Sequence, residues 1–432
     1  MIFCDEQRCD AVAEVVSDIS TLSSVLLWRS KKKYNHPKIA SYTDTIALGY
    51  GKSLPLVELG KDDPAILMYT SGTTGKPKGV VQTNRGVTHA LNAAIVQALV
   101  GMSLKPKGGE KPTNTPNSIL LTVPLFHATG LHAIFLLSTI VGRKIVMQYK
   151  WDAERALQLI EREKVTHFTG VPTMVLELMQ HKNFDMYDTS TLQQIGGGGA
   201  PPPPSMVHDV GKKFKRAAPT QGYGMTETNA VVTFNSGDAY VLRPTSCGQV
   251  VPFVQVEIWD DNHSSLGPEQ VGRVMVKGAN IMKGYYKNPK ATRESITVDG
   301  FLDTGDIGKL SADNFLYILD RAKDMVIRGG ENISCAEVEA AVYEVEAVAE
   351  CAVIGVPHPT LQEEVAVAVY AKEGQEITLE QIQLACGNLA KFKRPVHLFK
   401  WPERLPRGAT GKIVKKEIRS MIQMLQNKQS KL

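Results

Sequence analysis

The chain lacks a hydrophobic run long enough to cross a bilayer. Its most apolar window, residues 130–142, is shorter than the roughly 20 apolar residues that a membrane helix needs, so we expect a core helix there. Cysteine is also scarce, with 6 residues in 432, and no pair has Cys-x-x-Cys spacing or a nearby histidine cluster. This pattern argues against a zinc site or a disulfide framework, and it predicts reduced, mostly buried thiols in an intracellular protein.

An excess of charge of one sign is missing as well. The net charge is +5, charged residues make up 22% of the chain, and the clustered basic residues of a nucleic-acid binder are absent, so we expect no nucleic-acid partner. We expect no secretory leader either, because Met1–Phe3 runs almost directly into charged residues that begin at Asp5. A length of 432 residues fits two or three globular domains.

What the chain does contain is a loop rich in glycine and hydroxyl side chains. It follows an apolar run, residues 65–69, that we expect to be a buried strand, and residues 70–79 read TSGTTGKPKG. Glycine lets the backbone approach a ligand closely, so that N–H groups, hydroxyls and lysines can surround one anion. The predicted phosphate-binding residues are Thr70, Ser71, Gly72, Thr73, Thr74 and Lys78. Pro77 after Gly75-Lys76 breaks the Walker A pattern of P-loop NTPases.

Alternating strand-like and helical patterns predict an α/β fold. From residue 65 to about 230 they favour a largely parallel sheet covered by helices, and from about 231 to 319 they favour a β-rich subdomain. We therefore expect a large N-terminal domain of layered α/β sheets over residues 1–320, a hinge at 321–324 and a small α+β C-terminal domain over 325–432. Individual helices are expected over residues 11–24, 153–164 and 336–345.

The 70–79 loop resembles the phosphate loop of the adenylate-forming superfamily, which includes acyl-CoA synthetases, aryl-CoA ligases and luciferases. Further motifs resemble that superfamily, in the same order, from about Asp63 to Lys416. The resemblance implies an acid–thiol ligase, in which a carboxylate attacks the α-phosphate of ATP, pyrophosphate leaves, and the thiol of CoA displaces AMP. It therefore implies ATP, Mg²⁺ and CoA, together with a carboxylic acid substrate.

Two motifs place the implied nucleotide and acyl contacts. In QGYGMTET, residues 221–228, the resemblance implies that Tyr223 packs on adenine, Thr226 bonds a phosphate and Glu227 holds Mg²⁺, a metal that needs only one or two carboxylates besides phosphate and water. In the motif PLFHATG, His127 would lie beside the substrate carboxylate and gate the acyl channel. Gln221 and Gly222 are further implied nucleotide contacts in the first motif. A separate stretch, residues 198–201, resembles the loop that lines one face of adenine, which adds Gly199 and Ala200.

The remaining implied contacts lie on either side of the expected hinge. Asp306 would accept both ribose hydroxyls, Arg321 would reach the ribose, and Lys323 would be the pivot. Gly330 would leave room for the pantetheine arm of CoA. Lys412, in LPRGATGKI, would offset the repulsion between the carboxylate and the α-phosphate as they approach.

Several alternatives remain open at the level of sequence. Members of the superfamily have a longer segment before the phosphate loop, so we expect a fragment or a short form.

A fatty acid is the expected substrate, because Ala128 and Thr129 leave room beside His127, while coumarate-like and oxalate-type acids are the alternatives. A non-catalytic nucleotide-binding remnant is the alternative of another class, although every motif residue is present. A partner-binding role for the prolines at 201–204 is less favoured than a stiffened turn.

The last three residues resemble a targeting signal rather than a structural element. Ser430, Lys431 and Leu432 form the tripeptide that the peroxisomal import receptor reads. We therefore expect a peroxisomal protein that interacts with that receptor.

Overall fold

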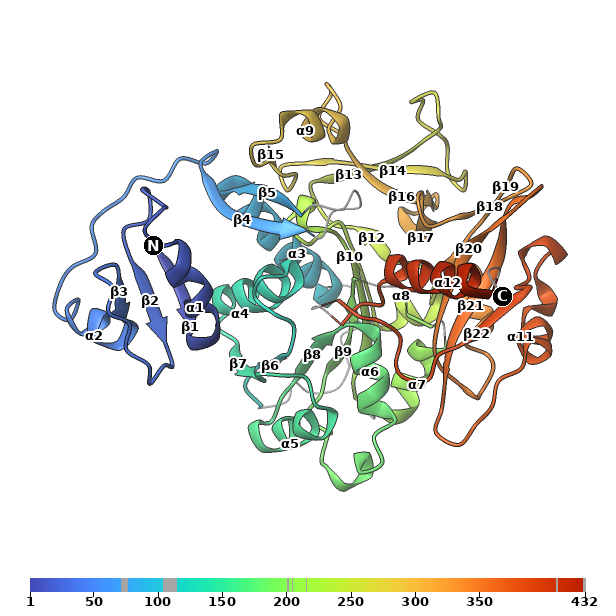
Figure 1. Cartoon of the computed structure of the whole chain (residues 1–432), viewed down its shortest axis with the longest axis horizontal. Coiled ribbons are helices and arrows are strands. Elements are labelled where there is room, and N and C mark those ends of the chain that lie inside the picture. Colours follow the sequence, from blue (N-terminus) through green and yellow to red (C-terminus); the bar gives the residue numbers. More distant parts are fainter. Residues whose placement is uncertain are drawn as a thin grey trace. The chain divides into compact units, whose positions relative to one another are not determined.

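The computed structural model describes residues 1–70, 77–103, 115–199, 202–203, 205–214, 216–408 and 411–429. These residues form two compact units, Met1–Leu59 and Gly60–Leu432. Figure 1 gives the labels of the helices and strands.

The first unit is a three-stranded parallel sheet with two helices. Its strands β1 (Ile2–Asp5), β2 (Val25–Trp28) and β3 (Ile39–Ser41) pair in that order, and its helices are α1 (Glu6–Val15) and α2 (Tyr42–Ala47). The helix predicted over residues 11–24 is wrong in its bounds. Asp5 caps α1 by accepting a hydrogen bond from the N–H of Arg8 (3.1 Å), and the Ser/Asp/Thr-rich stretch after Val16 favours turns over helix.

The second unit is built on an 11-stranded sheet with the order β13-β14-β16-β17-β12-β11-β10-β9-β8-β6-β7. Its parallel half consists of β6 (Ser118–Leu121), β7 (Lys144–Met147), β8 (His167–Gly170), β9 (Gln194–Gly198) and β10 (Ala218–Tyr223). Its antiparallel half consists of β11 (Thr233–Ser236), β12 (Gly248–Val250), β13 (Val254–Trp259), β14 (Gly272–Gly278), β16 (Leu302–Leu310) and β17 (Phe315–Arg321). The predicted parallel region and β-rich subdomain are therefore halves of one sheet, joined where β10 pairs with β11.

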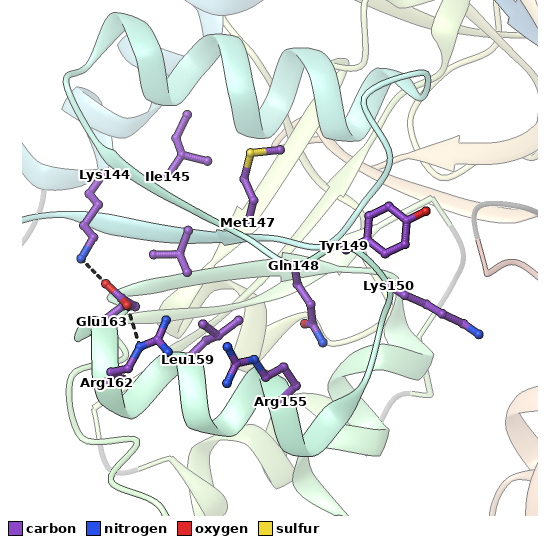
Figure 2. Close-up of a pocket in the computed structure, with 11 residues that line it drawn as sticks. Lys144, Ile145, Met147, Gln148, Tyr149, Lys150, Arg155, Leu159, Arg162 and Glu163 are labelled. Atoms are coloured by element: carbon purple, nitrogen blue, oxygen red, sulfur yellow. Dashed lines mark hydrogen bonds and ion pairs between the residues drawn. The ribbon is translucent and has the colours of Figure 1, made fainter. Parts of the chain in front are cut away.

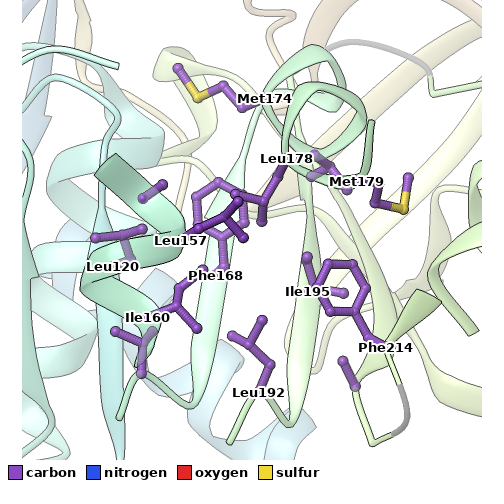
Figure 3. Packing of buried hydrophobic residues seen from close by; sticks show 14 of the residues in the cluster. Leu120, Leu157, Ile160, Phe168, Met174, Leu178, Met179, Leu192, Ile195 and Phe214 are labelled. Carbon is purple, nitrogen blue, oxygen red and sulfur yellow. The ribbon is translucent and has the colours of Figure 1, made fainter. Parts of the chain in front are cut away.

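Helices pack on the parallel half and bury its main hydrophobic core. They are α5 (Ala153–Glu163), α6 (Pro172–Met179), α7 (Met206–Lys213) and the shorter α8 (Gly237–Leu242). Among the other helices, α3 (Asn84–Ser103) and η3 (Thr226–Thr228) contact β5, and α9 (Pro289–Ser295) contacts β15 and β16. The remaining short helices are α4 (Leu137–Ile140) and η2 (Phe184–Met186). The prediction of a helix over residues 153–164 is confirmed, with Asp152 as N-cap and a left-handed Lys164 as C-cap. Figure 3 shows Leu157 of α5, Phe168 of β8 and Leu178 of α6 packed together.

The apolar window at residues 130–142 is helical, as predicted. It forms a π-helix, η1 (Thr129–Leu136), that continues into α4. No helix in the described part of the chain is long and apolar enough to cross a membrane. The six cysteines are free, and five of them are buried.

The predicted phosphate loop connects two strands of a small antiparallel sheet. This sheet has the order β15-β5-β4 and consists of β4 (Pro64–Thr70), β5 (Lys78–Thr83) and β15 (Gly284–Tyr285). The strand expected at residues 65–69 is confirmed as β4, but the expectation that it is buried is wrong. Only Met68 is buried, while Leu67 and Tyr69 are exposed, because β4 is an edge strand that pairs with β5 alone.

The C-terminal part has its own sheet, with the order β19-β18-β21-β20 and β22 paired to β21. Its elements are β18 (Val326–Arg328), β19 (Glu331–Ile333), α10 (Cys335–Val342), β20 (Val348–His358), β21 (Gln362–Ala371), α11 (Leu379–Ala385), η4 (Cys386–Asn388), η5 (Lys391–Lys393), β22 (His397–Lys400) and α12 (Lys415–Gln429). α12, red in Figure 1, packs its Ile418 and Ile422 against β20. α10 confirms the helix expected at 336–345, with Ser334 as N-cap.

The predicted hinge falls mostly in a connection between strands. β17 ends at Arg321 and β18 begins at Val326. The α/β fold class is confirmed, and the role of residues 321–324 as a hinge stays a prediction.

Replacing a core leucine of the parallel half should destabilise the protein much more than replacing an exposed one. Leu178 is fully buried in the main core, whereas Leu384 on α11 is 82% exposed. We expect Leu178→Ala to lower the free energy of unfolding by about 2–5 kcal/mol, because it leaves a cavity, and Leu384→Ala to change it by less than about 0.5 kcal/mol. Urea unfolding of both variants measures this, and equal midpoints would contradict the assigned core.

Candidate functional site

The predicted site residues of the parallel half lie at the carboxyl ends of its strands. β9 and β10 pair in parallel with Gln221 opposite Gly197 and Gly222 opposite Gly198, so the two strand ends deliver Gly199 and Tyr223 side by side. β6 ends nearby in sequence, at Leu121, before His127. The carboxyl edge of a parallel sheet is where open α/β folds bind their ligands.

Lys412 reaches this edge by occupying the space where Gly199 has no side chain. Gly199 has a φ of +84°, and a Cβ placed on it would lie 2.8 Å from Cε and 3.0 Å from Nζ of Lys412. Gly411, with a φ of +81°, supplies the left-handed turn that precedes Lys412. The structure therefore brings together two motifs that the sequence separates widely.

Arg407 holds the loop that carries Lys412 from two sides. Its Nη1 donates to the carbonyl oxygen of Gly411 (2.5 Å) and to Oγ1 of Thr173 on α6 (3.2 Å). Its Nη2 forms an ion pair with Oε1 of the buried Glu350 on β20 (2.8 Å). One guanidinium thus connects the Lys412 loop to a helix of the parallel half and to the C-terminal sheet.

Burial and neighbouring charges set the protonation of Lys412 and His127. Burial and the charge of Arg321 lower the pKa of Lys412 to about 8, against the raising effect of Asp306. Burial and the charge of Lys412 lower the pKa of His127 to about 4, so His127 is neutral near pH 7. Its Nδ1 accepts a hydrogen bond from the N–H of Thr129 (3.3 Å), which leaves the proton on Nε2 as a donor.

Asp306, Arg321 and Tyr223 form a second group beside Lys412. Asp306 and Arg321 are paired residues of β16 and β17, and Nε of Arg321 lies 3.4 Å from Oδ1 of Asp306. The hydroxyl of Tyr223 donates to Oδ2 of Asp306 at 2.6 Å. Burial raises the pKa of Asp306, while the positive charge of Arg321 opposes that rise. The group offers a fixed carboxylate acceptor next to an aromatic ring, as the resemblance implied for ribose and adenine.

Thr226 and Glu227 lie in the short helix η3, which is bonded from several sides. The amide of Gln82 on β5 donates to the carbonyl oxygen of Thr226 (2.8 Å), and the N–H of Met282 donates to that of Glu227 (2.8 Å). The hydroxyl of Tyr285 on β15 donates to Oε1 of Glu227, also at 2.8 Å. Both Thr226 and Glu227 are buried.

Glu227 fits the predicted role of a magnesium ligand. One oxygen of its carboxylate is fixed by Tyr285, and no described residue bonds the other. The described residues contain no group of three or more His, Cys, Asp or Glu side chains that could hold a metal by themselves. A single carboxylate that shares the ion with phosphate oxygens and water is the donor set of Mg²⁺ rather than of zinc.

Of the other predicted residues, some lie in the described part of the chain and the rest lie outside it. Thr70 and Lys78 face each other across the β4–β5 pair, at the base of the predicted phosphate loop. Gly330 lies in the turn between β18 and β19 with a φ of +87°, and no contact among the described residues connects it to the Lys412 cluster. Ser71, Gly72, Thr73, Thr74, Ala200 and the terminal Ser430, Lys431 and Leu432 lie outside the described residues, and their roles stay predictions.

Sequence reasoning missed three residues that support the site. Gln82 and Tyr285 contact the predicted residues Thr226 and Glu227, and Arg407 contacts Gly411, the neighbour of Lys412; none of the three was assigned a role from the sequence. Gln82 on β5 and Tyr285 on β15 reach η3 from the small sheet. Arg407 bonds the turn that precedes Lys412. Only Arg407 lies within a recognised motif, so the motif around Lys412 was the one available signal.

A cavity of about 520 Å³ lies outside this site, between β7 and α5. Its rim is basic, and Figure 2 shows Glu163 paired with both Lys144 (2.6 Å) and Arg162 (2.8 Å). None of the residues that line it belongs to the groups around Lys412 or Glu227. The cavity is therefore not part of the candidate site.

Comparison with known proteins gives sequence relatives that are ligases. The chain is 31% identical over 376 residues to 4-coumarate-CoA ligase 1 of Narcissus pseudonarcissus, covering 85% of this chain and 66% of the relative. It is 33% identical over 375 residues to the long-chain-fatty-acid–CoA ligase of Bacillus subtilis, covering 84% of this chain and 63% of the relative. The chain thus spans about two thirds of the length of these curated relatives.

Two solved structures that resemble this chain contain ATP or an acyl-adenylate. ATP-bound MatB from Rhodopseudomonas palustris has a TM-score of 0.82 and 28% identity, over 97% of this chain and 78% of that one. The o-succinylbenzoate CoA synthetase of Bacillus subtilis, in complex with its acyl-adenylate, has a TM-score of 0.75 and 29% identity, over 95% and 80%.

Family models agree with the motifs. The model described as AMP-binding enzyme matches residues 1–286, and that described as AMP-binding enzyme C-terminal domain matches residues 337–412. The first match alone covers more than half of the chain and includes the predicted nucleotide motifs up to Glu227. On these grounds, and as its own motifs predicted, the chain belongs to the family of AMP-binding enzymes.

Proposed function

We propose that the chain is an ATP-dependent acid–CoA ligase that uses Mg²⁺. The observation that carries this proposal is the convergence of Lys412, Gly199 and the Asp306–Arg321 pair at the carboxyl edge of the parallel sheet. A buried cation, a ribose acceptor and an adenine platform in one place are what the activation of a carboxylate by ATP requires. The named activities of the curated relatives, coumarate–CoA and fatty acid–CoA ligation, support the same reaction class.

In the first half-reaction, a carboxylate oxygen of the acid forms a bond to the α-phosphorus of ATP. The bond from that phosphorus to the bridging oxygen of the β-phosphate breaks, and pyrophosphate leaves. Two anions must approach each other, and the ammonium of Lys412 stabilises the charge that builds up between them. The neutral His127 can donate its Nε2 proton as a hydrogen bond to the acid without adding a second charge. Bound Mg²⁺, held by Glu227, would supply further charge neutralisation on the phosphates.

In the second half-reaction, the thiolate of CoA attacks the carbonyl carbon of the acyl-adenylate. The bond from that carbon to the phosphate oxygen breaks, the thioester forms, and AMP leaves. The Asp306–Tyr223 group holds the ribose and adenine of the leaving AMP in this step as in the first. Catalysis in both steps consists of positioning and charge stabilisation rather than covalent chemistry by the protein.

We propose a fatty acid as the substrate and an aromatic acid as the alternative. Leu125 and Phe126, directly before His127, expose apolar side chains, which suits an alkyl chain or a ring more than a small dicarboxylate. The relatives include both a long-chain fatty acid ligase and coumarate ligases, so they support either class of acid.

The test of the proposed function is ATP–pyrophosphate exchange by the 432-residue chain with short, medium and long fatty acids and with coumarate. Exchange that depends on the acid would establish adenylation, and the best acid would identify the substrate class. A folded chain that binds ATP without any exchange would instead support a non-catalytic nucleotide-binding protein.

Lys412 should matter for adenylation far more than for thioester formation. We expect Lys412→Ala to slow pyrophosphate exchange by about 100-fold or more, because it removes a preorganised cation from the first transition state. CoA attack on a supplied acyl-adenylate should change little. Lys416→Ala, at an exposed position four residues further on, is the matched control. Equal losses in the two half-reactions would contradict the role.

The same lysine should set the alkaline limb of the pH profile. Its pKa of about 8 means that its charged fraction falls as the pH rises from 7 to 9. Because the charged form is the one required, kcat/KM for adenylation should decline through about pH 8 in the free enzyme. The limb should be absent from the residual activity of Lys412→Ala. A decline of the same shape in that variant would assign the titration to another group.

We also propose that Ser430, Lys431 and Leu432 direct the chain to peroxisomes through their import receptor. The chain with a fluorescent protein at its N-terminus should be found in peroxisomes of eukaryotic cells, and the same fusion without residues 430–432 should not. The same distribution for both fusions would remove this proposal.

A further inference from the structure

We propose that Tyr285 is a positioning residue for Glu227, and that it sets the affinity of the site for the divalent cation bound with ATP. The proposal rests on the proposed function, because it takes Glu227 as the carboxylate that shares the cation with the nucleotide. Its basis is a contact that no sequence motif indicated, the 2.8 Å hydrogen bond from the Tyr285 hydroxyl to Oε1 of Glu227.

Tyr285 is itself held rigidly. It lies in β15, opposite Val80 of β5, and its backbone N–H donates to Oγ1 of Thr292 (2.9 Å). The N–H of Tyr286 donates to the carbonyl oxygen of Gly79 (2.7 Å), which completes the attachment to β5. The hydroxyl is therefore a fixed donor, and it selects one orientation of the carboxylate.

The ring of Tyr285 also contacts the other end of the predicted phosphate site. Nζ of Lys78 lies 4.7 Å from the centre of this ring, within the range of a cation–π interaction. Lys78 begins β5 and belongs to the predicted phosphate loop. Tyr285 thus stands between the cation predicted to bind phosphate and the carboxylate predicted to bind the metal.

The backbone of Glu227 is fixed independently of its side chain. Its carbonyl oxygen accepts from the N–H of Met282, and the preceding carbonyl accepts from Gln82. Loss of the Tyr285 hydroxyl would therefore free the carboxylate to change its orientation without moving η3. Groups that orient a metal ligand in this way typically contribute 10- to 100-fold to metal affinity.

The neighbouring tyrosine is a matched control. Tyr286 also has a lysine over its ring, with Nζ of Lys287 5.3 Å from the centre, but it is 49% exposed. None of the described residues accepts a hydrogen bond from its hydroxyl. Tyr286→Phe therefore removes the same atom from the adjacent position without touching a carboxylate.

The experiment compares Tyr285→Phe, Tyr286→Phe and Glu227→Gln in the full chain. Binding of Mn²⁺ in the presence of ATP, followed by electron paramagnetic resonance, gives metal affinity without turnover, and the Mg²⁺ dependence of pyrophosphate exchange gives it during turnover. We expect Tyr285→Phe to weaken metal binding by about 10-fold in both measurements, with ATP binding in EDTA unchanged. Tyr286→Phe should match the parent chain.

A double variant separates positioning from a general structural effect. If Tyr285 acts through Glu227, Tyr285→Phe should weaken metal binding no further once Glu227→Gln is present. A full additional loss in that background, or a titration of Tyr285→Phe like that of the parent, would overturn the proposal. Circular dichroism at the assay temperature checks that each variant is folded. A parent chain that shows neither Mn²⁺–ATP binding nor exchange would refute the proposed function before the tyrosines are compared.

Discussion

The candidate site depends on one steric constraint, the absence of a side chain at Gly199. The end of Lys412 lies where a Cβ on Gly199 would be, so a side chain at this left-handed position would displace the ammonium from its place at the carboxyl edge of the parallel sheet. The constraint also sets electrostatics, because the close approach buries the ammonium and places it within the influence of Arg321 and Asp306. Burial is the main cause of the lowered pKa of His127, and the charge of Lys412 lowers it further. The position that the ammonium takes beside Gly199 thus contributes to the pKa of both Lys412 and His127.

The second organising feature is the continuity of the large sheet. Tyr223 ends the last parallel strand, while Asp306 belongs to the antiparallel half, and a hydrogen bond joins them. The site is therefore assembled from both halves of one sheet, with the small β15-β5-β4 sheet contributing Gln82 and Tyr285 from another side. Arg407 then attaches the loop of Lys412 to this framework.

Local sequence chemistry made several helices and motif residues predictable. Asp152 and Ser334 cap α5 and α10 where short polar side chains precede apolar periodicity, and both helices were predicted close to their observed bounds. The motifs pointed to Lys412, Asp306 and Tyr223, which the structure brings close together, because the order of residues in a motif can be read without knowing the fold. What failed depended on tertiary context. Residues 65–69 look buried by composition, yet β4 is an edge strand, and the Asp5 cap starts α1 earlier than apolar spacing suggested. Tyr285 lies far from Glu227 in sequence, and tertiary contacts, the β15–β5 pairing among them, bring them together.

The bond between Tyr223 and Asp306 has a consequence for which nucleotides the protein can accept. The two residues belong to one hydrogen-bonded sheet, so the backbone limits how far the ring of Tyr223 and the carboxylate of Asp306 can separate. If Asp306 accepts the ribose hydroxyls as proposed, a deoxyribose would offer it one hydroxyl fewer, so a preference for ribonucleotides would come from this carboxylate and would not depend on which acid is used.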